Sequence, residues 1–157
     1  MPDNLSLIKT IGLPMLESAG GLVYNDNFHI LLIFKRGKWD LPKGKLSSKR
    51  ASHVKTAVRE VNEETGLDEK KLNVEGKIVS TWHSTKYKKS NYLKKTHWYL
   101  MHYNGRDADI TPEIKEGIIE CRWVHISDLD SYRPLILTRI QYVIDFWLEN
   151  LAYEPRF

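Results

Sequence analysis

Three glutamates fall on one face of a predicted helix, within the segment Arg-Glu-Val-Asn-Glu-Glu-Thr-Gly-Leu at residues 59–67. In a helix, Glu60, Glu63 and Glu64 stand at positions i, i+3 and i+4, so their carboxylates are neighbours. Like charges at this spacing destabilise an isolated helix by about 0.2–0.5 kcal/mol per pair. Hard divalent cations such as Mg²⁺ bind oxygen ligands of this kind. The segment therefore predicts a helix that holds a metal ion.

Together with an upstream glycine, this segment resembles the signature box of the Nudix hydrolases. That box reads Gly, five residues, Glu, seven residues, then Arg-Glu-apolar-x-Glu-Glu-x-Gly-apolar. Residues 59–67 match its second half at every specified position, and Gly44 matches its first glycine. The first half departs from the pattern, because Arg50 stands where the family has Glu and eight residues separate it from Arg59. We interpret this as a one-residue insertion that affects the loop before the helix rather than the metal-binding half.

The resemblance covers the chain from about residue 19 to residue 147. Three further segments are similar to the family's first strands and to its late strand, tryptophan and turn: residues 18–24, 31–42 and 122–129. The resemblance implies one domain over residues 1–157, with a core of about residues 18–152. It also implies an α/β fold, a Nudix-type α/β/α sandwich with a central mixed β-sheet.

Hydrophobic patterning predicts the individual elements. Apolar stretches at residues 19–24 and 28–34, separated by Asn-Asp-Asn, indicate a hairpin. The metal-bearing helix is expected over residues 52–65 with Gly66 as its stop, followed by strands at 72–82, 96–103 and 118–126. Pro134 suits the first turn of a last helix. Apolar residues recur along that helix at three- and four-residue spacing: Leu137, Ile140, Ile144, Trp147, Leu148 and Leu151.

Composition indicates an ordinary water-soluble domain. Of 157 residues, 41% are hydrophobic and 28% are charged. No apolar run approaches the roughly 20 residues that cross a bilayer, so we expect no membrane partner. The single cysteine, Cys121, cannot form an internal disulfide and is expected to be a small buried residue. With no secretory signal at the N-terminus, this favours a cytoplasmic location. The oligomeric state is left open, with a homodimer as one option.

The resemblance and the spacing together assign candidate roles around the box. Glu60, Glu63 and Glu64 are the expected metal ligands, and the resemblance adds the main-chain carbonyl at Gly44 or at the residue before it. The expected cofactor is Mg²⁺, with Mn²⁺ as the alternative. Arg59 cannot bind a cation, so we expect it to orient a glutamate carboxylate.

The general base is sought outside the box, where many members of the family carry a glutamate. Glu116 and Glu120, just before Trp123, are the candidates, and Glu113 is a weaker third. Either of the first two is also consistent with a solvated residue at a strand edge.

A second functional signal is a basic segment with five lysines and no acid, at residues 86–95. Between two predicted strands it is expected to be an exposed loop. One interpretation is a solvated hairpin tip, and the other is a clamp for phosphates. The expected substrate-binding residues are Lys35, Arg36, Lys86, Lys88 and Lys89. Aromatic and histidine side chains in or beside the segment are further candidates for contacting the substrate: Trp82, His83, Tyr87, Tyr92, His97 and Trp98.

These observations favour an enzyme that hydrolyses a phosphoanhydride in a nucleoside diphosphate-linked small molecule, with a nucleotide or dinucleoside polyphosphate as the preferred class. One alternative is a diphosphoinositol polyphosphate hydrolase, which the five lysines would suit. Another is a Nudix-like module that senses a nucleotide without turnover, although the intact glutamates argue against it. An RNA-binding protein rests on the basic segment alone, without any recognisable motif, so nucleic acid is not an expected partner.

Overall fold

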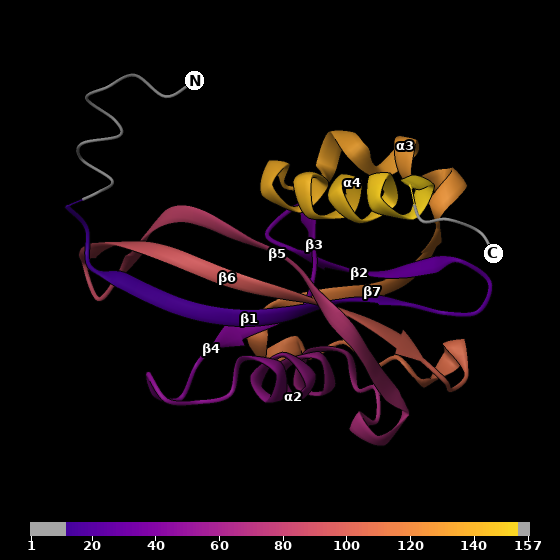
Figure 1. Cartoon of the computed structure of the whole chain (residues 1–157), viewed down its shortest axis with the longest axis horizontal. Helices are drawn as coiled ribbons and strands as arrows, with labels where there is room; N and C mark the ends of the chain where they lie inside the picture. Colours follow the sequence, from indigo (N-terminus) through magenta and orange to yellow (C-terminus); the bar gives the residue numbers. More distant parts are fainter. Residues whose placement is uncertain (1–11, 154–157) are drawn as a thin grey trace.

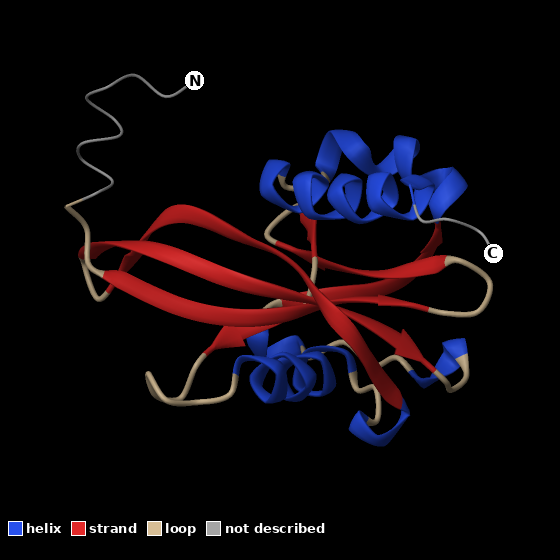
Figure 2. Ribbon diagram, viewed as in Figure 1, coloured by secondary structure: helices blue, strands red, loops and turns tan. Residues whose placement is uncertain are grey.

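The structure is a computed structural model that describes residues 12–153, with side chains described to residue 151. One mixed sheet forms the central layer, with helix α2 (His53–Thr65) on one face and helices α3 (Leu129–Tyr132) and α4 (Thr138–Tyr153) on the other (Figures 1 and 2). The predicted α/β/α sandwich is therefore confirmed.

The sheet has seven strands: β1 (Met15–Tyr24), β2 (His29–Lys35), β3 (Lys38–Asp40), β4 (Lys43–Lys45), β5 (Leu72–Tyr87), β6 (Ser90–Tyr103) and β7 (Ile118–His125). Their order is β3-β2-β1-β6-β5, with β4 paired to β1 and β7 paired to β2. Strands β1 and β6 run parallel, and the other pairs are antiparallel. Short 3₁₀ turns lie at Glu69–Lys71, Asp107–Asp109, Ile114–Glu116, Ile126–Asp128 and Arg133–Leu135.

Alternation along the strands produces two hydrophobic cores, one on each face. In β1, Leu22 faces α4 while its neighbour Val23 faces α2. Helix α4 contributes Ile140, Val143, Ile144 and Trp147 to the first core. Helix α2 contributes Ala57 and Val61 to the second. The predicted apolar face of the last helix is confirmed at Ile140, Ile144 and Trp147, whereas Leu151 at its end is exposed.

Helix α2 begins and ends where its sequence predicts. Ser52 is the N-cap, and its Oγ accepts a hydrogen bond of 3.2 Å from the backbone N–H of Lys55. Gly66 ends the helix with φ +77°, and its N–H donates to the Asn62 carbonyl at 2.8 Å. The positions of the box glutamates along this helix are therefore fixed at both ends.

Two expectations about the elements are wrong, and two short strands were not predicted. The basic segment is not a loop, because β5 and β6 continue through it and only Lys88 and Lys89 form the turn. Pro134 lies in the 3₁₀ turn Arg133–Leu135, and α4 begins only at Thr138. Strands β3 and β4 were not anticipated, since three residues are too few to show a period.

We expect Gly66→Ala to lower the free energy of unfolding by about 1–2 kcal/mol, because a side chain at φ +77° is strained. Gly37→Ala is a matched control, since Gly37 has φ +76° but no atom within 4 Å of the new methyl group. At Gly66 the methyl group would also lie 3.1 Å from Thr111 Cβ. Urea denaturation should therefore show a loss at Gly66 at least as large as at Gly37. A smaller loss would contradict the helix end described here.

Candidate metal and phosphate site

The glutamate cluster is held where strand β4 meets helix α2. Gly44 lies directly against Glu60, and a methyl group at this position would overlap the Glu60 carboxylate. One residue earlier, the backbone N–H of Lys43 donates a 2.8 Å hydrogen bond to Glu64 Oε1. Two adjacent residues of one strand thus contact two carboxylates one helical turn apart, which fixes how the helix sits on the sheet.

Both of these carboxylates hold protons more tightly than usual. Glu64 is 5% exposed, and burial raises its pKa to about 7 against the opposing effect of the Lys43 N–H and ammonium. Burial also raises the pKa of Glu60, against Arg59, and the carboxylates of Glu63 and Glu116 add to the rise. A cation among these groups would favour their charged forms. Carboxylate oxygens are the donors that Mg²⁺ or Mn²⁺ binds. Among the described residues, the ligand atoms of Glu60, Glu63 and Glu64 do not all lie within 4.8 Å of one another.

Arg59 lies between two of the glutamates. Its Nη1 is 2.9 Å from Glu63 Oε1 and 3.1 Å from Glu60 Oε1. These contacts raise the pKa of the guanidinium, chiefly through the hydrogen bond to Glu63. This is the geometry expected of a residue that orients carboxylates, and the role itself stays a prediction.

The two candidate bases are placed differently. Glu120 on β7 is engaged by Arg122, whose Nε lies 3.0 Å from Glu120 Oε1. Glu116 is exposed in the turn Ile114–Glu116, and its charge acts on Glu60. Glu113 is partly buried, and its side chain caps the same turn by accepting from the Lys115 N–H at 3.0 Å. Glu116 is thus the candidate whose charge acts on a box glutamate, Glu60, and both Glu116 and Glu120 stay untested predictions.

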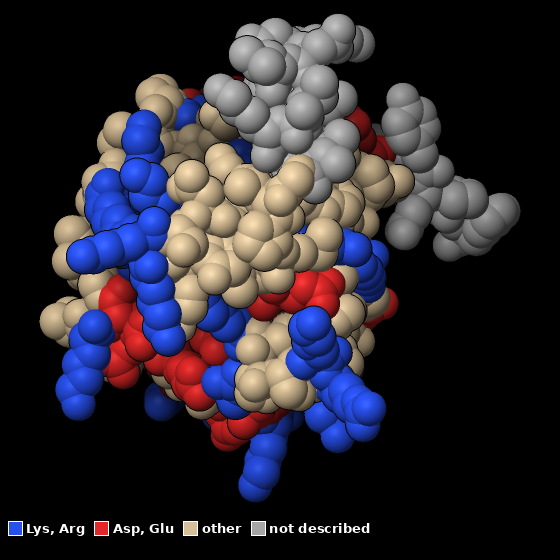
Figure 3. Space-filling view, turned by 90° about the vertical axis from the view of Figure 1, so that its left-hand side faces the viewer, with Lys and Arg blue, Asp and Glu red and all other residues tan. Residues whose placement is uncertain are grey.

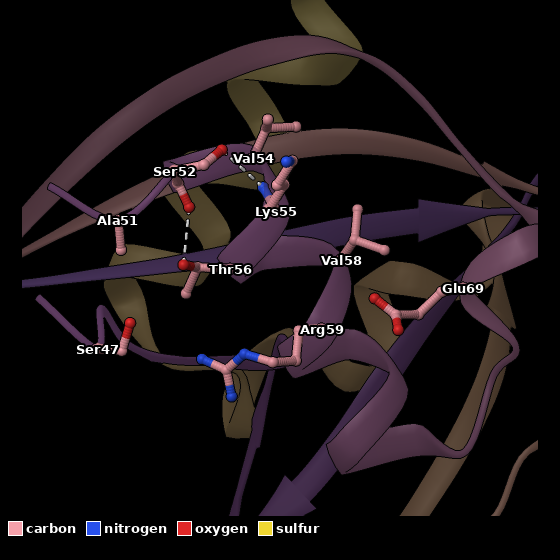
Figure 4. A pocket seen from close by; sticks show the side chains of 9 residues that line it. All are labelled: Ser47, Ala51, Ser52, Val54, Lys55, Thr56, Val58, Arg59 and Glu69. Carbon is pink, nitrogen blue, oxygen red and sulfur yellow. Dashed lines mark hydrogen bonds between the residues drawn. The ribbon is translucent and has the colours of Figure 1, made fainter.

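The segment that departs from the box lies away from the carboxylates. Residues 46–52 form the loop before α2, and Arg50 is exposed there rather than placed in the cluster. The loop forms one wall of a hollow of about 500 Å³ along the outer side of α2 (Figure 4). Arg59 lines the same hollow. The loop that departs from the box thus lies beside Arg59 along helix α2.

On the opposite face of the sheet lies a cationic cluster that consists of Lys43, His83, Lys94 and Arg139. Burial, together with the charges of neighbouring cations, lowers the pKa of Lys94 to about 8 and that of His83 to about 4. Asp40 is the nearby acid, and its Oδ2 contacts Lys43 Nζ at 2.6 Å. One carboxylate does not balance four basic side chains, so the cluster is suited to an anion.

The floor of this cluster contains polar atoms without partners. Among the described residues, six buried side-chain atoms have no hydrogen-bond partner, and four of them belong to Ser18, His83, Thr96 and Arg139. Ser18 and Thr96 are register partners on β1 and β6, and Lys94 and His83 are partners on β6 and β5. Buried polar atoms are normally satisfied, so this concentration indicates a place where a polar ligand binds.

The predicted substrate-binding lysines are dispersed. Lys86, Lys88 and Lys89 are exposed at the end of the β5–β6 hairpin, which extends past both α2 and α4 (Figure 1). The face toward which this end points carries Lys and Arg side chains around a band of acidic residues (Figure 3). Lys35 is partly buried and its charge acts on Glu64, whereas Arg36 is exposed in the β2–β3 turn. Of this set, only Lys35 is placed near the carboxylates.

A model of the NUDIX domain matches residues 15–146. The chain belongs to the Nudix hydrolase family. Among solved structures, an Ap4A hydrolase from C. elegans superposes with a TM-score of 0.64 and 17% identity, covering 87% of this chain and 98% of the other. A MutT protein from Methanosarcina mazei Go1 gives a TM-score of 0.62 and 23% identity, covering 88% and 97%.

A bifunctional NMN adenylyltransferase/ADP ribose pyrophosphatase from Francisella tularensis, complexed with AMP and a Mn ion, gives a TM-score of 0.64 and 18% identity. The match covers 92% of this chain and 44% of that one. At such identities, these likenesses show a shared Nudix fold. Within residues 12–153, no helix is long and apolar enough to cross a membrane.

Sequence reasoning found the Nudix box and named His83 and Lys94 as candidates for phosphate contact, but it did not predict that they meet in one cluster with Lys43 and Arg139. Arg139, Ser18 and Thr96 were not singled out, because their convergence depends on strand register. Trp98, suggested as lining the pocket, is buried and donates to Thr81 Oγ1 at 2.9 Å. His97, suggested as a phosphate contact, lies on the α2 face beside Glu17. The alternation of side chains in β6 is the one signal that separates Lys94 from His97.

Without divalent metal, the Nudix domain should lose stability as pH rises from about 4.5 to about 7. The pKa of Glu64 is about 7 in the folded protein and 4.5 in the unfolded chain. Between these values the folded protein holds a proton that the unfolded chain has released, so a rise in pH favours unfolding. The slope from one such proton is at most about 1.4 kcal/mol per pH unit. Urea denaturation in EDTA should show a flatter profile for Glu64→Gln, whereas parallel profiles would contradict the buried, protonated carboxyl.

Proposed function

We propose that this protein hydrolyses a phosphoanhydride bond in a nucleoside diphosphate-linked substrate, with a nucleotide or dinucleoside polyphosphate as the preferred class. The proposed cofactor is Mg²⁺, or Mn²⁺ in its place. Glu60, Glu63, Glu64 and the carbonyl of Gly44 would hold it. When bound, such an ion neutralises phosphate charge and lowers the pKa of coordinated water.

The observation that carries the proposal is the pair of enclosed carboxylates, Glu60 and Glu64, that contact β4. Glu64 is 5% exposed and receives one N–H, and Glu60 leaves no space at Gly44 for a larger residue. A cluster retained for stability alone would be expected to pair each buried carboxylate with a cation. Arg59 contacts Glu60 and Glu63 but leaves Glu64 to the Lys43 N–H. The protein therefore preserves a position for a further positive charge.

The positions of Arg59 and of the acidic residues outside the box suggest the remaining catalytic roles. Arg59 orients Glu60 and Glu63 through charge-assisted hydrogen bonds. Glu116 is the preferred general base, because it is exposed and its charge reaches Glu60. Glu120 is the alternative, and it would have to leave its ion pair with Arg122 to accept a proton. Both assignments await a pH–rate profile of each variant.

Beyond the scissile bond, the cationic cluster supports a substrate with several phosphates. Lys43 joins the two parts of the site, because its N–H binds Glu64 while its ammonium belongs to the cluster on the other face. A chain of phosphates that begins at the carboxylates and continues past β4 would meet Lys94, His83 and Arg139. The exposed hairpin lysines would then attract the substrate rather than hold it.

Aromatic side chains beside the cluster favour a nucleotide over a diphosphoinositol phosphate. Trp82 and Tyr142 are each 53% exposed, and both line a groove of about 610 Å³ together with His83 and Arg139. Stacking of a nucleobase on such a ring contributes about 1–3 kcal/mol. An inositol ring has no π-face with which to stack. A sensing module without turnover would not need the oriented carboxylates.

Glu64→Gln should lower kcat at least about 100-fold, or ~2.7 kcal/mol, because it removes a direct ligand while preserving the shape of the side chain. Turnover should be measured on nucleoside triphosphates, dinucleoside polyphosphates, nucleotide sugars and diphosphoinositol phosphates, with Mg²⁺ or EDTA. Full-rate turnover by the variant, or in EDTA, would refute the site. Preferential cleavage of diphosphoinositol phosphates would overturn the nucleotide class alone.

Lys94→Met should raise KM about five- to tenfold with a smaller effect on kcat, because its contact is made equally in ground and transition states. The increase should be larger for substrates with more phosphates and should shrink at high salt. Lys86→Met is the matched control, since it removes the same charge from an exposed position on the same hairpin. Equal KM values for the two variants would place phosphate binding elsewhere.

A further inference from the structure

A second group of metal-ligand side chains lies at the start of helix α2, apart from the glutamate cluster. Glu17 on β1, His97 on β6 and His53 at the first position of α2 have ligand atoms that all lie within 4.8 Å of one another. His97 is 3% exposed, and the other two side chains are partly buried. We propose that these three residues form a binding site for Zn²⁺ that is distinct from the Mg²⁺ site.

The donor set distinguishes the two sites chemically. Two imidazole nitrogens and one carboxylate suit a borderline ion such as Zn²⁺, whereas the all-oxygen set of the box suits Mg²⁺. Tetrahedral zinc with bonds of about 2.0–2.2 Å places its ligand atoms about 3.4 Å apart. Glu17 Oε1 and His97 Nε2 are already 3.1 Å apart. The two side chains from the sheet are therefore preorganised, and His53 completes the set.

The strand register separates the sites. Ala19 on β1 is the partner of Gly44 on one side and of His97 on the other. Two strand spacings, about 10 Å, thus lie between the backbone that contacts Glu60 and the backbone that carries His97. Within the part of the chain that the structure describes, no box glutamate belongs to the group of ligand atoms formed by Glu17, His53 and His97. An ion at Glu17, His53 and His97 would instead join β1, β6 and the first turn of α2.

One side chain must turn for all three donors to bind one ion. The imidazoles of His53 and His97 are stacked, with centroids 3.9 Å apart and 21° between their planes. Nitrogen lone pairs lie in the ring plane, so two parallel rings do not aim at a common point. His53 is the ring that can rotate, because it is partly exposed at the start of the helix, whereas His97 is enclosed in the sheet.

Lys77 on β5 competes with the metal. Its Nζ lies 2.9 Å from His97 Nδ1, and His97 Nε2 faces Glu17. An ammonium at Nδ1 makes that nitrogen the acceptor and leaves the ring proton on Nε2, where a metal would bind. Zn²⁺ at Nε2 requires the proton to move to Nδ1, where Ser80 Oγ at 3.5 Å is the alternative partner. Lys77 therefore weakens the site, and removing its charge should strengthen it.

The test uses the full-length protein with saturating Mg²⁺, titrated with Zn²⁺ and with Co²⁺ as a spectroscopic probe. We expect one ion per chain, Co²⁺ bands typical of nitrogen ligation, and a higher Tm, because the ion binds the folded state. His53→Ala and Glu17→Gln should each weaken binding at least tenfold. Lys77→Gln should tighten it, an outcome that general destabilisation does not produce.

Two controls separate this site from other sources of binding. His102→Ala removes another imidazole that pairs with a carboxylate, Asp26 at 2.6 Å, and should leave Zn²⁺ affinity unchanged. Glu64→Gln should lower kcat at least about 100-fold and retain Zn²⁺, so failure of the proposed hydrolase activity would not affect this result. Binding that survives His53→Ala, disappears in Glu64→Gln, or is weakened by Lys77→Gln would overturn the proposal.

Discussion

The contact between β4 and α2 fixes the position of everything else in the site. Gly44 allows Glu60 to approach the strand, and the Lys43 N–H holds Glu64 at 2.8 Å. The capped ends of α2, at Ser52 and Gly66, then determine where Glu63 and Arg59 stand. A larger residue at Gly44 would push the helix away and disturb both carboxylates together. The lack of a side chain at Gly44 is therefore what allows Glu60 and Glu64 to lie close to β4.

Strand β4 also links two sites of opposite charge. Its backbone contacts the carboxylates on the α2 face, while the Lys43 side chain belongs to the cationic cluster on the α4 face. Ser18 on the neighbouring strand β1 and Thr96 on β6, the next strand, add buried polar atoms without partners. Three residues of strand thus connect the proposed cation-binding face to the proposed anion-binding face across the thickness of one sheet.

The parts that could be predicted from sequence are those set by local chemistry. The cap at Ser52, the stop at Gly66 and the helical spacing of the glutamates all depend on neighbours within a few residues. The β5–β6 hairpin could not be predicted from the sequence. Its turn places Lys88 and Lys89 at φ 50° and 66°, whereas the usual sequence signal for such a turn is Asn-Gly. Without that turn the register is unknown, so the meeting of Lys94, His83 and Arg139 was also hidden. The predicted clamp accordingly fell on exposed lysines at the tip.

On both sides of β4, burial disfavours the charged forms of the side chains. This links the binding of the proposed divalent cation to that of the proposed polyphosphate. It raises the pKa of Glu64 to about 7 and lowers the pKa of Lys94 to about 8 and of His83 to about 4. Each face is therefore less charged than its composition suggests. A divalent cation favours ionised glutamates, and a polyphosphate favours protonated Lys94 and His83. Since the phosphates also bind the cation, each ligand strengthens the site for the other, and binding of the two should be cooperative.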